Sequence, residues 1–143
     1  MTGAQARVCV YGSSVAVDGQ GVLILGASGS GKSTLALQLL AFGAQLIADD
    51  QTLLTRLDDM VFASAPEAIK GRIEARGIGL LAADTVGPQR LQLVVDLDHP
   101  PAARLPDRRV HNVLGLEFDL ICGQDLSHLA VSVLQYLKGG RIA

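Results

Sequence analysis

One glycine-rich segment restricts the fold of this chain more than any other feature. Gly26 is followed by four unrestricted positions and then by Gly31, Lys32 and Ser33. The apolar run 22–25 before it is typical of a buried strand, and apolar residues follow Lys32 at helical spacing. Strand, loop and helix in this order indicate an α/β chain in which the loop joins the end of a strand to the start of a helix.

The residues of this segment predict a phosphate-binding loop. Glycines allow the backbone to curl so that successive amide N–H groups point inward, and the helix start adds the positive end of its dipole. Lys32 supplies a mobile positive charge for the β and γ phosphates of a nucleoside triphosphate, and the Ser33 hydroxyl is placed to bind the Mg²⁺ that bridges them. The expected nucleotide-binding residues are Gly26, Ala27, Ser28, Gly29, Ser30, Gly31, Lys32, Ser33 and Thr34. A chance match in a chain with 16 glycines is the alternative, and the flanking strand and helix argue against it.

Two adjacent carboxylates supply the next candidates. Asp49 and Asp50 end the short apolar run 46–48, one helix and one return strand after the loop. Sites of α/β proteins lie at the carboxyl ends of strands, so the chain can bring both side chains back beside Ser33. The pair can divide the roles of Mg²⁺ partner and general base, and a polar turn between two strands is the alternative.

A second glycine cluster spans residues 74–79. Glu74 and Arg76 lie two positions apart beside Gly77 and Gly79. A solvated Glu–Arg ion pair near a turn explains this pattern about as well as a functional role does.

The rest of the chain alternates apolar runs with turns. Strands are expected at residues 7–11, 14–17, 22–25, 46–48, 52–57, 60–63, 91–97, 110–114 and 118–121. Residues 98–109, with three prolines, are expected as a surface loop. Asp125 is expected to cap a helix over residues 126–137, and Gly43 to end the helix that follows the phosphate loop. The segment 66–81 is ambiguous, with a short helix around residues 68–73 as one interpretation.

Length and composition limit the remaining possibilities. A chain of 143 residues, 49% hydrophobic, has the size of one globular domain, 1–143. The formal net charge of -2 gives no electrostatic footprint for nucleic acid, and no apolar stretch is long enough to span a membrane. Cys9 and Cys122 stand apart in apolar contexts, so we expect two buried, reduced thiols in a cytoplasmic protein.

The three clusters together resemble the catalytic domain of HPr kinase/phosphorylase, especially the short form found in alphaproteobacteria. The similar segments are residues 11–13, 21–33, 43–50 and 73–79, in the order of the family and near its spacing. Looser similarity extends to Leu137, so the resemblance covers most of the chain.

The resemblance implies an ATP-dependent kinase that phosphorylates a serine of HPr, the phosphocarrier of the phosphotransferase system, and that can reverse the reaction with inorganic phosphate. Lys32 would bind the transferred phosphate, and Ser33 and Glu74 would hold Mg²⁺. Asp50 would be the base in the forward direction and the acid in reverse, with Asp49 supporting it, and Arg76 would line the site. These roles agree with the general requirements of phosphoryl transfer.

The chain departs from the family at two points. Tyr11 stands where the family usually has a His that partners the catalytic carboxylate. A tyrosine hydroxyl can donate a neutral hydrogen bond to Asp50, but it cannot carry the positive charge of an imidazolium. The family also has an additional N-terminal domain and a basic C-terminal loop motif, for which Arg104, Arg108 and Arg109 are only loose substitutes.

The sequence therefore predicts an α/β P-loop domain with a mixed central sheet that acts as a serine kinase on HPr. Two alternatives stay open: a non-catalytic sensor of nucleotides, and a kinase that acts on small molecules. The sequence does not decide between kinase and phosphorylase activity, and self-association into a homo-oligomer also stays open.

Overall fold

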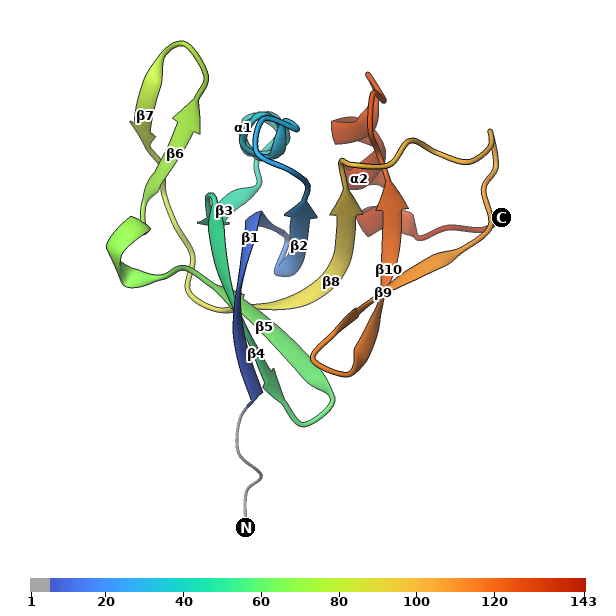
Figure 1. Cartoon of the computed structure of the whole chain (residues 1–143), viewed down its shortest axis with the longest axis horizontal. Helices are drawn as coiled ribbons and strands as arrows, with labels where there is room; N and C mark the ends of the chain where they lie inside the picture. The colour runs from blue at the N-terminus through green and yellow to red at the C-terminus, as the bar shows by residue number, and fades with distance from the viewer. Residues whose placement is uncertain (1–5) are drawn as a thin grey trace.

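The computed structural model describes residues 6–143, and its main element is a strongly bent mixed sheet (Figure 1). In the described part of the chain this sheet contains eight strands, β1 (Ala6–Val17), β2 (Gln20–Leu25), β3 (Gln45–Ala48), β4 (Gln51–Leu57), β5 (Met60–Ser64), β8 (Gln89–Asp96), β9 (Arg109–Val113) and β10 (Leu116–Cys122). The other elements lie outside this sheet. They are the helices α1 (Lys32–Ala41) and α2 (Leu129–Gly139), a short 3₁₀ helix η1 (Glu67–Ile69), and a separate hairpin of β6 (Arg72–Ala75) and β7 (Gly79–Ala82). The mixed α/β architecture expected from the sequence is confirmed.

The direction of the strands sets the position of the loops. β2 pairs in parallel with β8, and β8 pairs in parallel with β10. β1 runs antiparallel to both β2 and β3, so β3 has the same direction as β2. The carboxyl ends of β2, β3, β8 and β10 therefore lie at one edge of the sheet, which is where sites of α/β proteins form.

β1 pairs with different strands along its first and second halves. Its first half pairs with β4, from Ala6 opposite Arg56 to Tyr11 opposite Gln51, and its second half pairs with β2 and β3. The two short strands expected at residues 7–11 and 14–17 are thus one continuous strand, because the change of partner requires no break in the backbone. The pairings β2–β1, β1–β4, β4–β5, β5–β8 and β8–β2 close a ring.

Two apolar cores lie on opposite faces of the central strands, because successive side chains of a strand alternate between faces. Val22 and Ile24 of β2 belong to one core, and Leu23 between them belongs to the other. The helices supply Leu35, Ala36, Leu39, Leu129, Ala130 and Val133 to the first core. The β4–β5 hairpin supplies Leu54, Val61 and Ala63 to the second. The central strands are buried on both faces, which explains their continuous apolar runs.

α1 starts directly from the phosphate loop and ends where the sequence predicts. The Ala44 N–H donates to the Leu39 carbonyl at 3.1 Å, and the Gly43 N–H donates to the Leu40 carbonyl at 3.0 Å. This pair of bonds is a Schellman motif, and Gly43 has the positive φ of 102° that the motif requires.

The ambiguous segment 66–81 contains no helix over residues 68–73. The 3₁₀ helix η1 ends at Ile69, Lys70 is already extended with a ψ of 137°, and strand β6 begins at Arg72. One helix start was predicted wrongly. The C-terminal helix begins at Leu129 and not at residue 126. Asp125 has a φ of 62° and lies in the turn before it, so it does not cap the helix.

α2 is attached to the sheet by a polar contact as well as by the core. The Tyr136 hydroxyl donates to Asp119 Oδ2 of β10 at 2.6 Å. Burial, and then this hydrogen bond, raise the pKa of Tyr136 to about 12. Among residues 6–143 no helix is long and apolar enough to cross a membrane.

The prediction of two buried cysteines is wrong. Cys9 is exposed, and Cys122 is partly exposed. Cys9 lies in the first half of β1, where five of the first six positions are exposed and Val10 packs against the second core. The other expected strands, the hairpin turn at residues 58–59 and the proline-rich loop are confirmed, with bounds shifted by a few residues.

Candidate active site

The phosphate loop connects β2 to α1 and closes on itself. The Ser30 N–H donates to the Ala27 carbonyl at 3.0 Å, and the Leu35 N–H donates to the Gly31 carbonyl at 2.9 Å, which starts the helix. Gly26 needs to be glycine for two reasons. Its φ is 156°, and a Cβ on it would stand 2.4 Å from Ser30 Oγ. The loop thus curls tightly between β2 and α1, as an anion cradle requires.

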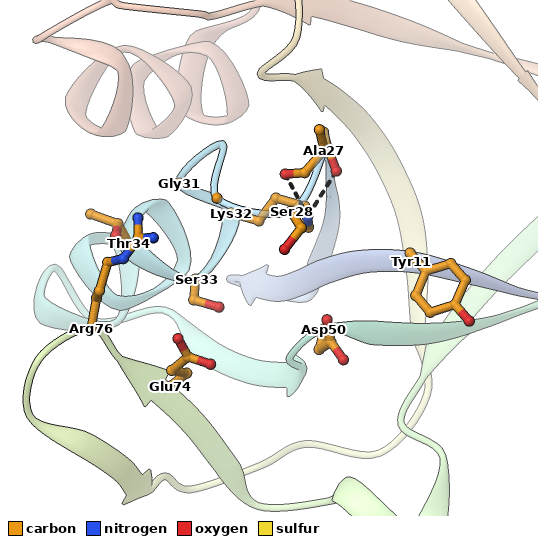
Figure 2. A pocket seen from close by; sticks show the side chains of 12 residues that line it. Tyr11, Ala27, Ser28, Gly31, Lys32, Ser33, Thr34, Asp50, Glu74 and Arg76 are labelled. Carbon is orange, nitrogen blue, oxygen red and sulfur yellow. Dashed lines mark hydrogen bonds between the residues drawn. The ribbon is translucent and has the colours of Figure 1, made fainter.

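A cavity of 540 Å³ opens beside this loop (Figure 2). Its lining comes from four parts of the chain that are far apart in sequence: β1, the loop with the start of α1, the turn after β3, and the β6–β7 hairpin. The lining residues are Tyr11, Gly26, Ala27, Ser28, Gly29, Gly31, Lys32, Ser33, Thr34, Asp50, Glu74 and Arg76. The volume lies in the range of known small-molecule sites.

Lys32 turns its side chain back over the loop. Its Nζ donates to the carbonyl oxygen of Gly26 at 2.7 Å and to that of Ala27 at 3.1 Å. The ammonium group therefore lies at the mouth of the cradle, in contact with neutral acceptors only. A mobile cation at this place can exchange these carbonyls for phosphate oxygens.

Asp49 is the most highly connected side chain of the site. It is 7% exposed, and its Oδ1 accepts hydrogen bonds from Ser13 Oγ and from Ser33 Oγ, each at 2.7 Å. Its Oδ2 accepts the Glu74 backbone N–H at 2.9 Å. Asp49 thus joins β1, the phosphate loop and the β6–β7 hairpin, and it orients the hydroxyl of Ser33.

Asp50 takes the opposite direction and lines the cavity. The Gln51 N–H donates to the Asp49 carbonyl at 2.8 Å, and Asp50 lies between them with a φ of 70°. This three-residue turn is strained for a residue with a Cβ, and aspartate tolerates it better than most. The turn separates the two carboxylates, so Asp49 points into the protein and Asp50 into the cavity. Such strain is typical of functional positions.

Glu74 and Arg76 form the outer wall of the cavity. Figure 2 shows the Glu74 carboxylate directed toward Ser33, and the Arg76 guanidinium beside Thr34 at the start of α1. Arg76 Nη2 lies 4.0 Å from the position that a Cβ on Gly29 would take. Between residues 6 and 143 Glu74 and Arg76 form no ion pair with each other, since the His99–Asp96 contact is the one found there. The ion-pair alternative for this cluster is therefore not realised.

Tyr11 lies at the rim of the cavity. Its side chain is 76% exposed, and its ring in Figure 2 lies beside Asp50 with the hydroxyl directed away from the carboxylate in this view. Among the hydrogen bonds of residues 6–143, none joins the Tyr11 hydroxyl to Asp50. The structure brings the two residues to one cavity but does not form the hydrogen bond that the sequence allowed.

The basic residues of the proline-rich loop lie elsewhere. Arg104 and Arg109 line a second cavity of 340 Å³. Arg108 Nη2 donates to the Arg141 carbonyl at 2.7 Å. None of the three lines the phosphate-loop cavity, so they do not replace a basic loop at the site.

The residues of the first cavity fit a nucleotide and Mg²⁺. Within residues 6–143, Ser30 Oγ is the one buried side-chain oxygen or nitrogen without a hydrogen-bond partner, and it lies inside the phosphate loop. Ser33 and Glu74 offer a hydroxyl and a carboxylate, the hard oxygen donors that Mg²⁺ takes together with phosphate oxygens and water. The donor set therefore suits a triphosphate with its metal ion.

The sequence interpretation missed two residues of this region. Ser13 is fully buried, donates to Asp49 and accepts the Asp50 N–H at 3.3 Å. Asp98 accepts the Ala27 N–H at 2.9 Å. The position of Ser13 within an apolar strand could have identified it as a residue with a polar partner, because a buried hydroxyl needs one. Asp98 carried no signal, since it stands in a polar loop after β8.

Comparisons with known proteins find relatives over most of the chain. The family model for the HPr Serine kinase C-terminal domain matches residues 4–133. The HPr kinase/phosphorylase of Thermoanaerobacter sp. (strain X514) is 40% identical over 123 residues, which cover 80% of this chain and 39% of that protein. HPr kinase/phosphorylase 1 of Oceanobacillus iheyensis is 32% identical over 142 residues, which cover 94% of this chain and 44% of that protein. The chain thus spans about two fifths of the length of these relatives.

A solved structure shares the fold. The HPr(Ser) kinase/phosphatase from Coxiella burnetii superposes with a TM-score of 0.76 at 23% sequence identity, covering 92% of this chain and 94% of that chain. The arrangement of strands and helices described above is therefore an arrangement already seen in an experimental structure.

Proposed function

Because this chain belongs to the family of HPr serine kinase C-terminal domains, we propose that it transfers the γ-phosphoryl group of ATP to a serine of an HPr-like phosphocarrier protein. The observation that carries the proposal is the link between Asp49 and Ser33, with Asp50 aimed into the same cavity. A phosphate loop, a carboxylate that orients its serine and a second carboxylate free for proton transfer are the parts that phosphoryl transfer needs.

The residues around the loop would hold Mg-ATP. The amide groups of the loop and Lys32 would bind the phosphates, while Ser33 and Glu74 would bind Mg²⁺, which neutralises charge on the phosphate oxygens. Asp49 would act from behind by fixing the Ser33 hydroxyl, because its own carboxylate is buried. Arg76, on the outer wall beside Thr34, would contact the phosphates.

Asp50 would perform the proton transfer. In the forward direction its carboxylate takes the proton of the substrate serine while the serine oxygen bonds to the γ-phosphorus and ADP leaves. In the reverse direction the same group, now protonated, returns the proton to the serine oxygen as inorganic phosphate takes the phosphoryl group and forms pyrophosphate. The exposure of Asp50 allows a polypeptide hydroxyl to reach it.

Incubation of the protein with Mg-ATP labelled at the γ position and purified HPr tests the proposal. We expect label on one serine of HPr, identified by mass spectrometry, and none on HPr whose target serine is replaced by Ala. Label that appears only on small metabolites would contradict the protein substrate. Tight ATP binding without transfer to either acceptor would favour a nucleotide sensor, the alternative that Tyr11 in place of the family's His leaves open.

Replacement of Tyr11 by His is expected to raise transfer to HPr and to introduce a pH dependence. An imidazole has an ordinary pKa of about 6.5, so its positive charge beside Asp50 is present below that pH and is lost as the pH rises through it. The carboxylate is held ionised in the first state and accepts a proton more readily in the second. The rate of transfer, measured from about pH 5.5 to 8.5 where His titrates, should bend near neutrality only in the variant.

Tyr11→Phe is the matched control for this substitution. It keeps the ring and removes a hydroxyl that makes no hydrogen bond with Asp50, so its pH profile should follow that of the wild type. Superimposable profiles for wild type and Tyr11→His would show that position 11 is only a strand residue at the rim of the cavity.

A further inference from the structure

One peptide group of the phosphate loop is held from both ends by opposite charges. The carbonyl of Gly26 accepts Lys32 Nζ at 2.7 Å, and the N–H of Ala27, which belongs to the same peptide group, donates to Asp98 Oδ1 at 2.9 Å. The negative end of the peptide dipole thus faces an ammonium group, and its positive end faces a carboxylate. Hydrogen bonds in such a chain polarise and strengthen one another.

Asp98 is itself held in place by the strand that precedes it. Its N–H donates to Asp96 Oδ1 at 2.7 Å, and Asp96 Oδ2 lies 2.7 Å from His99 Nδ1. The Leu97 N–H donates to the Leu25 carbonyl at 2.9 Å, which keeps the end of β8 against the end of β2. The carboxylate of Asp98 therefore reaches the loop from a turn that is held by two contacts, the hydrogen bond to Asp96 and the bond between Leu97 and Leu25.

The peptide group needs such a restraint because it follows a glycine. Gly26 has a φ of 156°, and glycine populates positive and negative φ values about equally readily. Rotation of this peptide would turn the Gly26 carbonyl away from Lys32 and would change the direction of the first N–H of the loop. Nothing else in residues 6–143 accepts the Ala27 N–H.

We propose that Asp98 is a positioning residue that locks the Gly26–Ala27 peptide and thereby places Lys32 for nucleotide binding. The inference rests on the proposed function, since it assigns the loop to ATP. Among residues 6–143, Asp98 forms no hydrogen bond or ion pair with Lys32 and does not line the cavity, so it acts through the peptide between them. Its negative charge opposes a bound triphosphate, so a role as a simple electrostatic attractor is ruled out by sign.

Two substitutions separate the effect of the Asp98 hydrogen bond from the effect of its negative charge. Asp98→Ala removes the acceptor and the charge, and Asp98→Asn removes the charge but keeps an oxygen acceptor. We expect the dissociation constant of Mg-ATP, measured by calorimetry, to rise about three- to tenfold for Asp98→Ala, the scale of one hydrogen bond. For Asp98→Asn it should be equal to or lower than that of the wild type.

Asp107→Ala is the matched control, because Asp107 is an exposed carboxylate at the other end of the same loop and lines the second cavity. It should bind Mg-ATP as the wild type does. Equal affinities for wild type, Asp98→Ala and Asp98→Asn would overturn the inference. Tighter binding by both Asp98 variants would also overturn it, since it would mean that Asp98 acts by repulsion alone.

A second measurement, NMR spectroscopy of the backbone amides, requires no ATP. Its main result comes from the wild-type protein, so it does not depend on the folding of a variant. In the amide NMR spectrum of the wild-type protein, the Ala27 N–H is expected far downfield and slow to exchange, as for a donor to a carboxylate. The signal should stay downfield in Asp98→Asn by a smaller amount and move to the ordinary range in Asp98→Ala. An ordinary, fast-exchanging Ala27 signal in the wild type would contradict the proposal even if ATP binding were absent. Failure of the wild type to bind ATP, with a downfield Ala27 signal, would instead contradict the proposed function.

Discussion

Lys32→Ala is expected to abolish phosphoryl transfer and to weaken Mg-ATP binding by about 30-fold or more, the equivalent of about 2 kcal/mol for a hydrogen bond to a charged group. Lys32 is the one lysine that lines the phosphate-loop cavity among residues 6–143. Its ammonium contacts only the carbonyls of Gly26 and Ala27, so the fold should survive its loss. Calorimetry gives the affinity, and the melting temperature verifies folding.

Lys70→Ala is the control for this change, since Lys70 is an exposed lysine outside the cavity. It should bind Mg-ATP with wild-type affinity. A folded Lys32→Ala protein with unchanged affinity would remove the assignment of residues 26–34 as the phosphate site.

Asp50→Asn should cut transfer to HPr by about 10² or more while Mg-ATP binding is kept, the usual scale for the loss of a positioned general base. Asparagine tolerates the positive φ of 70° at this position as well as aspartate does, so the turn should not change. Rates of transfer and dissociation constants, measured on the same preparation, separate chemistry from binding.

Asp49→Asn is expected to behave differently from its neighbour. Its carboxylate oxygens accept two hydroxyls and one amide in a buried place, and an Asn offers one acceptor oxygen in their stead. The cost is on the order of 1–3 kcal/mol of folding free energy, seen as a lower denaturation midpoint.

A folded Asp50→Asn enzyme that transfers phosphate at the wild-type rate would show that another residue is the general base. Asp49 is buried, so it would not be the first candidate.

The phosphate loop and the main strands could be predicted because their signals are local. The spacing of Gly26, Gly31 and Lys32, and the apolar runs of β2 and β8, are complete within short windows of sequence. The two faces of these strands are both buried, and a continuous apolar run records that fact directly.

The β6–β7 hairpin could not be predicted in the same way. β7 is exposed at every position, so its sequence carries no alternation of apolar and polar residues. What holds the hairpin in place is long-range: Ile73 packs in the core beside α1, and the Glu74 N–H donates to Asp49, 25 positions earlier. The pairing of Asp98 with Ala27 across 71 positions was hidden for the same reason.

The start of α2 could not be predicted from the sequence either. Asp125 stands before an apolar helical pattern, and aspartate is a preferred cap, but it has a φ of 62° and lies in a turn four positions before Leu129, the first residue of α2. Leu126 packs against the first core and lies in turns before the helix, with its N–H bonded to the Gly123 carbonyl and its carbonyl bonded to the Leu129 N–H.

The closed ring of β1, β2, β8, β5 and β4 has a consequence for the order in which the chain can fold. The β1–β2 hairpin joins neighbours through a two-residue turn, whereas the parallel pairing of Gly21 with Leu91 brings together segments that are distant in the chain. Entropy makes the local pairing fast and the distant one slow. During synthesis the phosphate loop leaves the ribosome before its supports on β3, β6 and the turn after β8. The proposed nucleotide site is therefore complete only when these distant segments have folded, so bound ATP would stabilise the finished structure and not its first steps.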